Sequence, residues 1–226
     1  MILRGENMAI MIFLGGLLNG CFLSIIIKKI SYLILNKENS EKYINKIDSK
    51  RCEKYTKLKI TNIIVILVSG LLFLISFLQL GLNIVFIKAL VLDSILIVVS
   101  FIDIEHQIIP NKVILYTLAI GVFFSFIDNI SFMNAASGML LGGGVLLLLA
   151  LVPGALGGGD IKLMFALGIF LGAKEVLVAL FLAFIIASII SILLLFFRIK
   201  KRKDHIPFGP FLAIGSFIAF HFSNFF

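Results

Sequence analysis

The sequence has little charge for its length, no tryptophan and only two cysteines. Charged residues make up 14% and hydrophobic residues 61% of its 226 residues, whereas a water-soluble domain carries roughly 25% charged residues. This shortage of charge excludes an ordinary soluble domain, and the absence of period-2 alternation argues against a membrane β-barrel. The cysteines, Cys21 and Cys52, belong to no C-x-x-C pair, so no metal site is predicted.

Long apolar runs occupy most of the chain. The majority are long enough to cross ~30 Å of hydrocarbon as helices. They predict an all-α, polytopic membrane protein of about eight transmembrane helices, which we treat as a single membrane domain over 1–226. We interpret Met8–Ile27 as the first spanning helix rather than a removed signal. The apolar segments fall at 8–27, 61–79, 82–103, 112–129, 134–152, 160–172, 175–197 and 207–225.

The positions of lysine and arginine predict the orientation. The net charge is +8, and most of the positive charge lies in the stretches 28–60 and 198–206. Basic loops stay in the cytoplasm and meet anionic lipid, so we expect the lipid bilayer as a partner and no nucleic acid. Eight spans with both termini outside place seventeen of the 20 basic residues on the inner side. The segment 28–60 is then predicted to be a basic cytoplasmic loop, either a small, partly helical excursion or a mobile loop.

Two acids lie at the edges of apolar runs. Asp103 ends the run Ile95–Ile102, Asp160 begins the run Ile161–Leu171, and the predicted topology puts both at the cytoplasmic ends of their helices. An ionisable group at the edge of a bilayer is costly, and its default interpretation is functional. Two neighbouring carboxyl groups share a proton, so one can deprotonate a water while the other donates to a carbonyl. The sequence therefore predicts that these two residues are the catalytic pair of an aspartic protease.

The residues around the acids are candidates for substrate binding or support. Three glycines, Gly157, Gly158 and Gly159, come directly before the second acid. Glycine adopts φ > 0 without strain and lets another backbone, such as an extended substrate, come close. Lys162 is interpreted either as a residue that orients substrate or as an anchor that reaches the membrane interface. Pro110 is expected to end the turn after the first acid and open the next helix.

Three sequence blocks, in this order along the chain, carry a family resemblance. Together they make the chain resemble a type IV prepilin peptidase, which is an intramembrane aspartic protease of the GxGD type. A glycine-rich stretch at 15–23 resembles the opening helix of that family more loosely. The three blocks are IDIEHQIIPN at 102–111, GGGDIKLM at 157–164 and IPFGPFLA at 206–213.

The resemblance implies cleavage of short, positively charged leaders from prepilin-like proteins, just before their hydrophobic segment. It implies an active site on the cytoplasmic side of the inner membrane, with Asp103 and Asp160 as the catalytic pair. The peptidase is expected to need no cofactor. Many relatives also methylate the new N-terminus with S-adenosylmethionine, and many bear two C-x-x-C pairs in the first cytoplasmic loop. Here that loop holds Cys52 alone, so S-adenosylmethionine is expected only if methylation is retained.

Two other classes of protein stay open. A protease of the presenilin or signal-peptide-peptidase kind shares the GxGD turn, but its Tyr-Asp and Pro-Ala-Leu blocks are missing here. A non-enzymatic transporter, coupled to ions or protons, also uses acids within the membrane. It would place them near the midplane, as Asp93 is placed in the third apolar segment. The position of Asp103 and Asp160 at one edge argues against that class.

Overall fold

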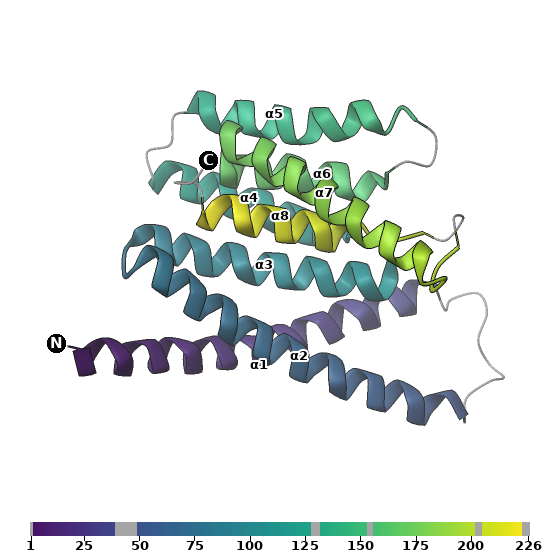
Figure 1. The fold of residues 1–226 in the computed structure, drawn as a ribbon, viewed down its shortest axis with the longest axis horizontal. Helices are drawn as coiled ribbons and strands as arrows, with labels where there is room; N and C mark the ends of the chain where they lie inside the picture. Colours follow the sequence, from purple (N-terminus) through teal and green to yellow (C-terminus); the bar gives the residue numbers. More distant parts are fainter. Residues whose placement is uncertain (1, 39–48, 128–131, 153–155, 202–204, 223–226) are drawn as a thin grey trace. The chain divides into compact units, whose positions relative to one another are not determined.

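The computed structural model describes residues 2–38, 49–127, 132–152, 156–201 and 205–222, and these form eight α-helices and no strand (Figure 1). The predicted all-α class is confirmed, and each predicted apolar segment falls on one helix. The helices are α1 (Ile2–Glu38), α2 (Ser49–Leu80), α3 (Ile84–His106), α4 (Asn111–Ile127), α5 (Phe132–Leu149), α6 (Gly158–Leu171), α7 (Ala173–Phe196) and α8 (Gly209–His221).

The lengths of the helices confirm a polytopic membrane protein. Five of the helices in the described part of the chain contain a stretch long and apolar enough to cross a membrane. The helices α4 and α8 are apolar but shorter. The helix α6 has 14 residues and extends about 21 Å at 1.5 Å per residue. Its first turn, which carries Asp160, therefore lies close to one end of a short apolar rod.

The basic segment 28–60, predicted as a loop, is largely helical. The helix α1 continues through Lys28 and Lys29 to Glu38, and α2 begins at Ser49. Residues 39–48, between these helices, lie outside the described residues. The loop boundaries were predicted from the ends of the apolar runs. They differ from the helix ends because a helix that continues through charged residues gives no hydropathy signal. Helix propensity of Lys, Glu and Arg is nonetheless high, which explains why the helices continue past those runs.

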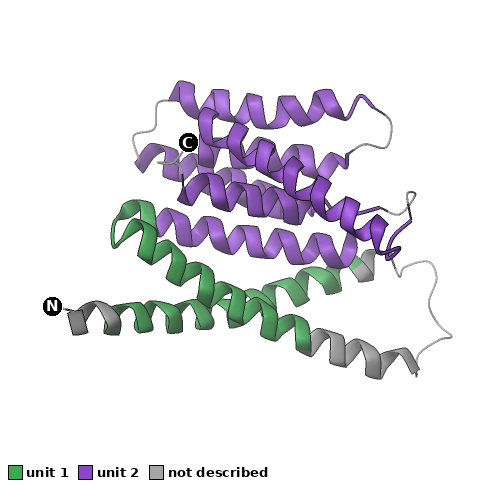
Figure 2. Cartoon of the chain, in the orientation of Figure 1, with its two compact units in different colours: residues 1–86 green, residues 87–226 purple. Residues whose placement is uncertain are grey.

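The chain divides into two compact units, residues 1–86 and 87–226 (Figure 2). In the first unit α1 and α2 pack through small residues. A Cβ on Gly16 would stand 2.8 Å from Cα of Gly70, and one on Gly20 would stand 2.6 Å from Cα of Ile66. The Gly16/Gly20 spacing thus marks a close helix contact, as the small-residue pattern of membrane helices leads one to expect.

In the second unit the closest approach is between α5 and α6. A Cβ on Gly138 would collide with the carbonyl oxygen of Gly168, and one on Gly168 would collide with the carbonyl oxygen of Gly138. One turn further along α5, a Cβ on Gly142 would stand 2.6 Å from the carbonyl oxygen of Met164. Only glycine fits at such a crossing. This contact sets the position of α6 and of the acid in its first turn.

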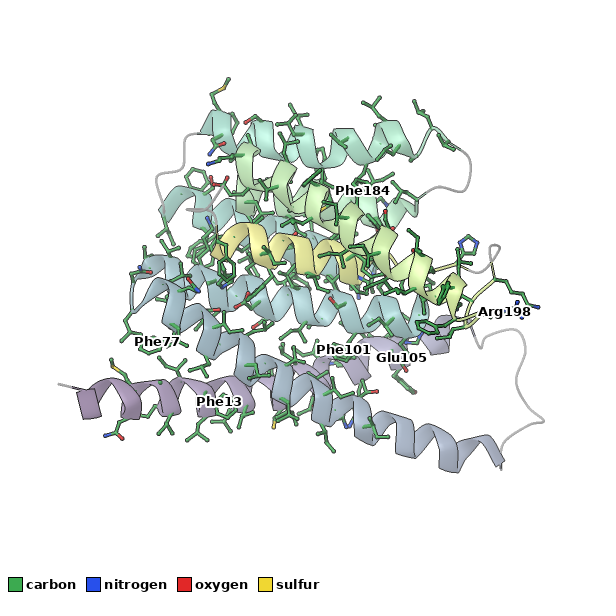
Figure 3. The ribbon with its side chains drawn as sticks, viewed as in Figure 1. Phe13, Phe77, Phe101, Glu105, Phe184 and Arg198 are labelled. Atoms are coloured by element: carbon green, nitrogen blue, oxygen red, sulfur yellow. The ribbon has the colours of Figure 1, made fainter. Side chains whose placement is uncertain are left out.

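The helices α6 and α7 are separated by one residue, Gly172, whose φ of 91° is open to glycine but strained for other residues. The side-chain oxygen of Asn134 on α5 accepts a hydrogen bond from the N–H of Ala173 at 3.0 Å and so caps α7. Further along α7, the ring of Phe184 lies 5.3 Å from that of Phe208, the residue before α8 (Figure 3). The chain reversal at Gly172 thus leaves α7 beside the start of α8.

Candidate active site

The last turn of α3 presents Asp103. The side chain is buried, with the residue 5% exposed. The helix ends at His106, and the next residue, Gln107, has a φ of 53°, the left-handed conformation that commonly closes a helix. The N–H of Gln107 donates to the carbonyl oxygen of Asp103 at 2.8 Å. Its side-chain amide donates to the carbonyl oxygen of His205 at 3.4 Å. The end of α3 is therefore joined to the segment that precedes α8.

The first turn of α6 presents Asp160. Gly157 caps the helix in an extended conformation, and the N–H of Asp160 donates to its carbonyl oxygen at 3.1 Å. An acid in the first turn is favoured by the partial positive charge of a helix N-terminus. Asp160 is also buried, with the residue 8% exposed. Local sequence thus explains why the helix begins here and tolerates a carboxylate.

Both acids line one cavity of about 240 Å³, and their carboxyl groups interact electrostatically. The carboxyl end of α3 and the amino end of α6 meet there. The rest of the lining is mixed: Gln107, Asn111 and Lys162 are polar, Ile108 and Ile109 are apolar, and the others are glycines. A cavity of this kind can admit a peptide bond and a water between two carboxyl groups, which is the arrangement that aspartic proteolysis requires.

Gly209, the first residue of α8, holds one of the acids. Its N–H donates to Oδ2 of Asp103 at 2.8 Å, in a buried hydrogen bond. A Cβ on Gly209 would stand 2.7 Å from the same oxygen and 3.0 Å from Cγ. Sequence analysis assigned no role to this residue, although the block at 206–213 contains it. The sequence signal for Gly209 was a glycine followed by a proline at a helix start. The same pair is equally typical of an ordinary turn.

Two of the three glycines before Asp160 pack closely, and none of the three has an unusual backbone conformation. The expectation that they adopt φ > 0 is wrong, because in the described residues only Gly81 and Gly172 do so among the glycines. A Cβ on Gly157 would stand 3.0 Å from Oδ2 of Asp160, and one on Gly159 would stand 3.2 Å from Cβ of Ile109. A Cβ on Gly158 would meet nothing within 4 Å. All three line the cavity with the acids.

Lys162 and Pro110 support the rim of the cavity. The amine of Lys162 donates to the side-chain oxygen of Asn111 at 3.3 Å, and both residues line the cavity. The carbonyl oxygen of Pro110 accepts from the N–H groups of Val113 and Ile114 at 3.0 and 3.3 Å. Pro110 therefore opens α4, as predicted, and α4 in turn positions Asn111 opposite the start of α6.

Comparison with known proteins identifies the family. Residues 90–192 match the type IV leader peptidase family, and this stretch contains both acids. The chain belongs to the type IV leader peptidase family. The resemblance inferred from the three sequence blocks is thereby confirmed, and the transporter alternative has no support.

Three relatives of this chain are named prepilin leader peptidase/N-methyltransferase. The protein of Bacillus subtilis (strain 168) is 31% identical over 164 residues, which cover 70% of this chain and 64% of that protein. The Neisseria gonorrhoeae protein is 30% identical over 172 residues, 73% and 59% of the two chains. The Pseudomonas aeruginosa protein is 33% identical over 132 residues, 55% and 45%. The matched part thus spans about half to two thirds of these relatives. No solved structure matches the chain.

A second cavity, of about 290 Å³, lies against Asp160. It shares Gly157 and Asp160 with the first cavity, and its other lining residues come from different parts of the chain. Phe208 and Phe211, at the start of α8, and Ala187 of α7 contribute apolar walls. Asp160 therefore lines both the cavity that contains Asp103 and a cavity between α7 and α8 with aromatic walls.

The remaining buried acid, Asp93, lies away from the cavities. It is fully buried in α3, and its Oδ2 lies 3.6 Å from Nε2 of His221 on α8. Sequence analysis placed Asp93 correctly within a span but did not connect it with this histidine. Among the described residues, no group of three or more His, Cys, Asp and Glu side chains could hold a metal. Independence from metal stays a prediction.

Proposed function

We propose that this chain is a membrane-embedded aspartic endopeptidase that removes short basic leaders from type IV prepilins or pilin-like precursors. The observation that carries the proposal is the meeting of two buried acids, Asp103 and Asp160, from different helices in one cavity. The family and the names of the relatives support the substrate class.

The two carboxyl groups divide the chemistry between them. One, ionised, takes a proton from a water that attacks the scissile carbonyl, and the other, protonated, donates to the carbonyl oxygen. Two carboxyl groups that lie close together titrate as a pair, so one is protonated while the other is ionised over part of the pH range. Oδ2 of Asp103 accepts the N–H of Gly209, so a proton on Asp103 belongs on Oδ1. The hydrogen bond thus orients Asp103 for the exchange with Asp160.

The second cavity beside Asp160 agrees with the apolar part of the proposed substrate. A prepilin-like substrate has a polar leader followed by an apolar segment. The aromatic walls Phe208 and Phe211 suit side chains on the apolar side of the scissile bond. The distribution of basic residues favours a site that faces the cytoplasm from the inner membrane.

Cleavage by this mechanism uses two carboxyl groups and a water and needs no cofactor. S-adenosylmethionine belongs to the proposal only if the chain also methylates the new N-terminus. The relatives are named for both activities, so methylation is tested separately, by following methyl transfer from labelled S-adenosylmethionine to the cleaved product.

The test of the peptidase uses the full chain in lipid nanodiscs with a prepilin-like substrate. Asp103→Asn and Asp160→Asn should each lower the cleavage rate by about 10³-fold or more, because each removes a proton-transfer group. Glu105→Gln is the matched control. Glu105 is an exposed acid on the same turn as Asp103, and its loss should leave cleavage unchanged. Substantial cleavage by either asparagine variant would remove that residue from the catalytic pair.

A further inference from the structure

Figure 1 shows α3 and α8 running alongside each other. They meet at two levels, and an aspartate of α3 takes part at each. Asp103 accepts the N–H of Gly209 at 2.8 Å. Ten residues earlier on α3, Asp93 lies 3.6 Å from His221, twelve residues later on α8. These separations correspond to about 15 and 18 Å along the helix axes. The helices therefore run antiparallel and are held near both ends of α8.

The contact between Asp93 and His221 is fully buried, with both side chains 0% exposed. Nδ1 of His221 lies 3.0 Å from the carbonyl oxygen of Phe217. A carbonyl only accepts, so Nδ1 carries a proton. If Nε2 carried no proton, its lone pair would face a carboxylate oxygen, so one further proton is shared between the imidazole and the carboxyl group. Loss of either residue would leave the other buried without this partner.

Lys88 adds a third ionisable group at this end of α8. It is buried, at 3% exposed, and its amine lies 5.7 Å from the ring centre of Phe220 and 5.8 Å from that of Phe170. Buried charges destabilise a fold unless they meet specific partners, and their best-attested use is to fix the register of packed helices. Because the surroundings are apolar, any other register of α8 would separate Lys88, Asp93 and His221 at a cost in stability.

The contact of α8 with α7 is also tight. A Cβ on Gly215 would collide with the carbonyl oxygen of Ala179 on α7, so this crossing restricts the register of α8 together with the buried polar pair. A shift of α8 by one residue moves its backbone about 1.5 Å along the axis and turns it by about 100°. The hydrogen bond between Gly209 and Asp103 could not survive that displacement.

We propose that His221 and Asp93 are positioning residues of the active site. Their contact fixes the axial register of α8 against α3 and thereby holds the N–H of Gly209 on the carboxyl group of Asp103. The kinetic consequence rests on the proposed peptidase function, whereas the effect on register does not depend on it.

The first test reads the register without reference to activity. Phe208–Gly209 is the single Phe-Gly pair in the sequence, so ¹³C′-phenylalanine and ¹⁵N-glycine labelling of the full chain isolates one amide signal. His221→Leu should move the Gly209 signal toward its position in Asp103→Asn. Ser216→Ala is the matched control, because its buried hydroxyl has no hydrogen-bond partner among the described residues. It should leave the signal in place.

The second test is kinetic. His221→Leu and Asp93→Leu should each lower kcat about tenfold with KM within about twofold, since a misplacement of about 1 Å is costly for catalysis. The exchanged pair, Asp93→His with His221→Asp, should recover most of kcat. If His221→Leu does not accumulate in the membrane, His221→Gln and the exchanged pair carry the same measurements.

The outcomes separate the two proposals. An unchanged Gly209 signal together with unchanged kcat in the His221 variants overturns the positioning role. A kcat loss in His221→Leu that the exchanged pair does not recover, with the Gly209 signal in place, also overturns it, because that pattern describes general destabilisation. If His221→Leu displaces the Gly209 signal but the wild-type chain cleaves no prepilin-like substrate, the positioning inference is retained and the peptidase function is removed.

Discussion

The N–H of Gly209 lies 2.8 Å from Oδ2 of Asp103, and a Cβ on Gly209 would come within 2.7 Å of the same oxygen. A methyl group there displaces either the carboxyl group or α8, and so removes the hydrogen bond in both cases. We predict that Gly209→Ala lowers kcat about 10²-fold, the size associated with loss of one well-placed backbone donor. Single-turnover cleavage of a prepilin-like peptide measures this effect.

The control for that variant is Gly144→Ala in α5, because a Cβ on Gly144 would meet nothing within 4 Å. It should leave kcat unchanged and raise stability slightly, since alanine favours a helix by about 1 kcal/mol over glycine. Full activity of Gly209→Ala would show that the hydrogen bond to Asp103 has no catalytic role.

The crossing of α5 and α6 is expected to control the position of Asp160. Gly138→Ala and Gly168→Ala each place a methyl group on a backbone carbonyl of the other helix. Forcing packed helices apart costs about 1–3 kcal/mol, so both variants should unfold at lower temperature and cleave more slowly. Thermal unfolding in detergent checks this. Wild-type stability in both variants would contradict the packing.

The topology is tested by labelling from outside the cell. Single cysteines at Lys174 and Lys201 are compared in a chain with Cys21 and Cys52 replaced by serine. The concentration of basic residues on one side predicts that position 201 is shielded from an impermeant thiol reagent and that position 174 reacts. Reaction at position 201 in intact cells would reverse the assigned orientation and place the acids on the outer side.

Peptidase activity is expected to persist in a strong chelator. The proposed chemistry uses two carboxyl groups and a water, and nothing in it requires a Lewis acid. The cleavage rates of the purified chain with and without chelator should agree within about twofold. Loss of a catalytic metal would lower the rate much more than that. Loss of activity that added zinc restores would show that the segment 28–60 holds a metal despite its single cysteine.

Much of the fold could be predicted because it depends on local properties. A run of apolar residues must satisfy its own backbone in lipid and so becomes a helix, which is why each predicted segment coincides with one helix. The same reasoning placed Asp103 and Asp160 at helix ends. It failed in the basic segment 28–60, because α1 and α2 continue as charged helices where hydropathy no longer indicates a boundary.

The sequence by itself therefore determined the helices, the membrane class and the two acids, since each is written in a short stretch of residues. The partners of those acids were decided by tertiary structure alone. Gly209 reaches Asp103 across 106 positions of the chain, and His221 reaches Asp93 through the same packing of α8. No local pattern encodes such contacts, because they depend on the register of one helix against another, which packing of the whole unit determines.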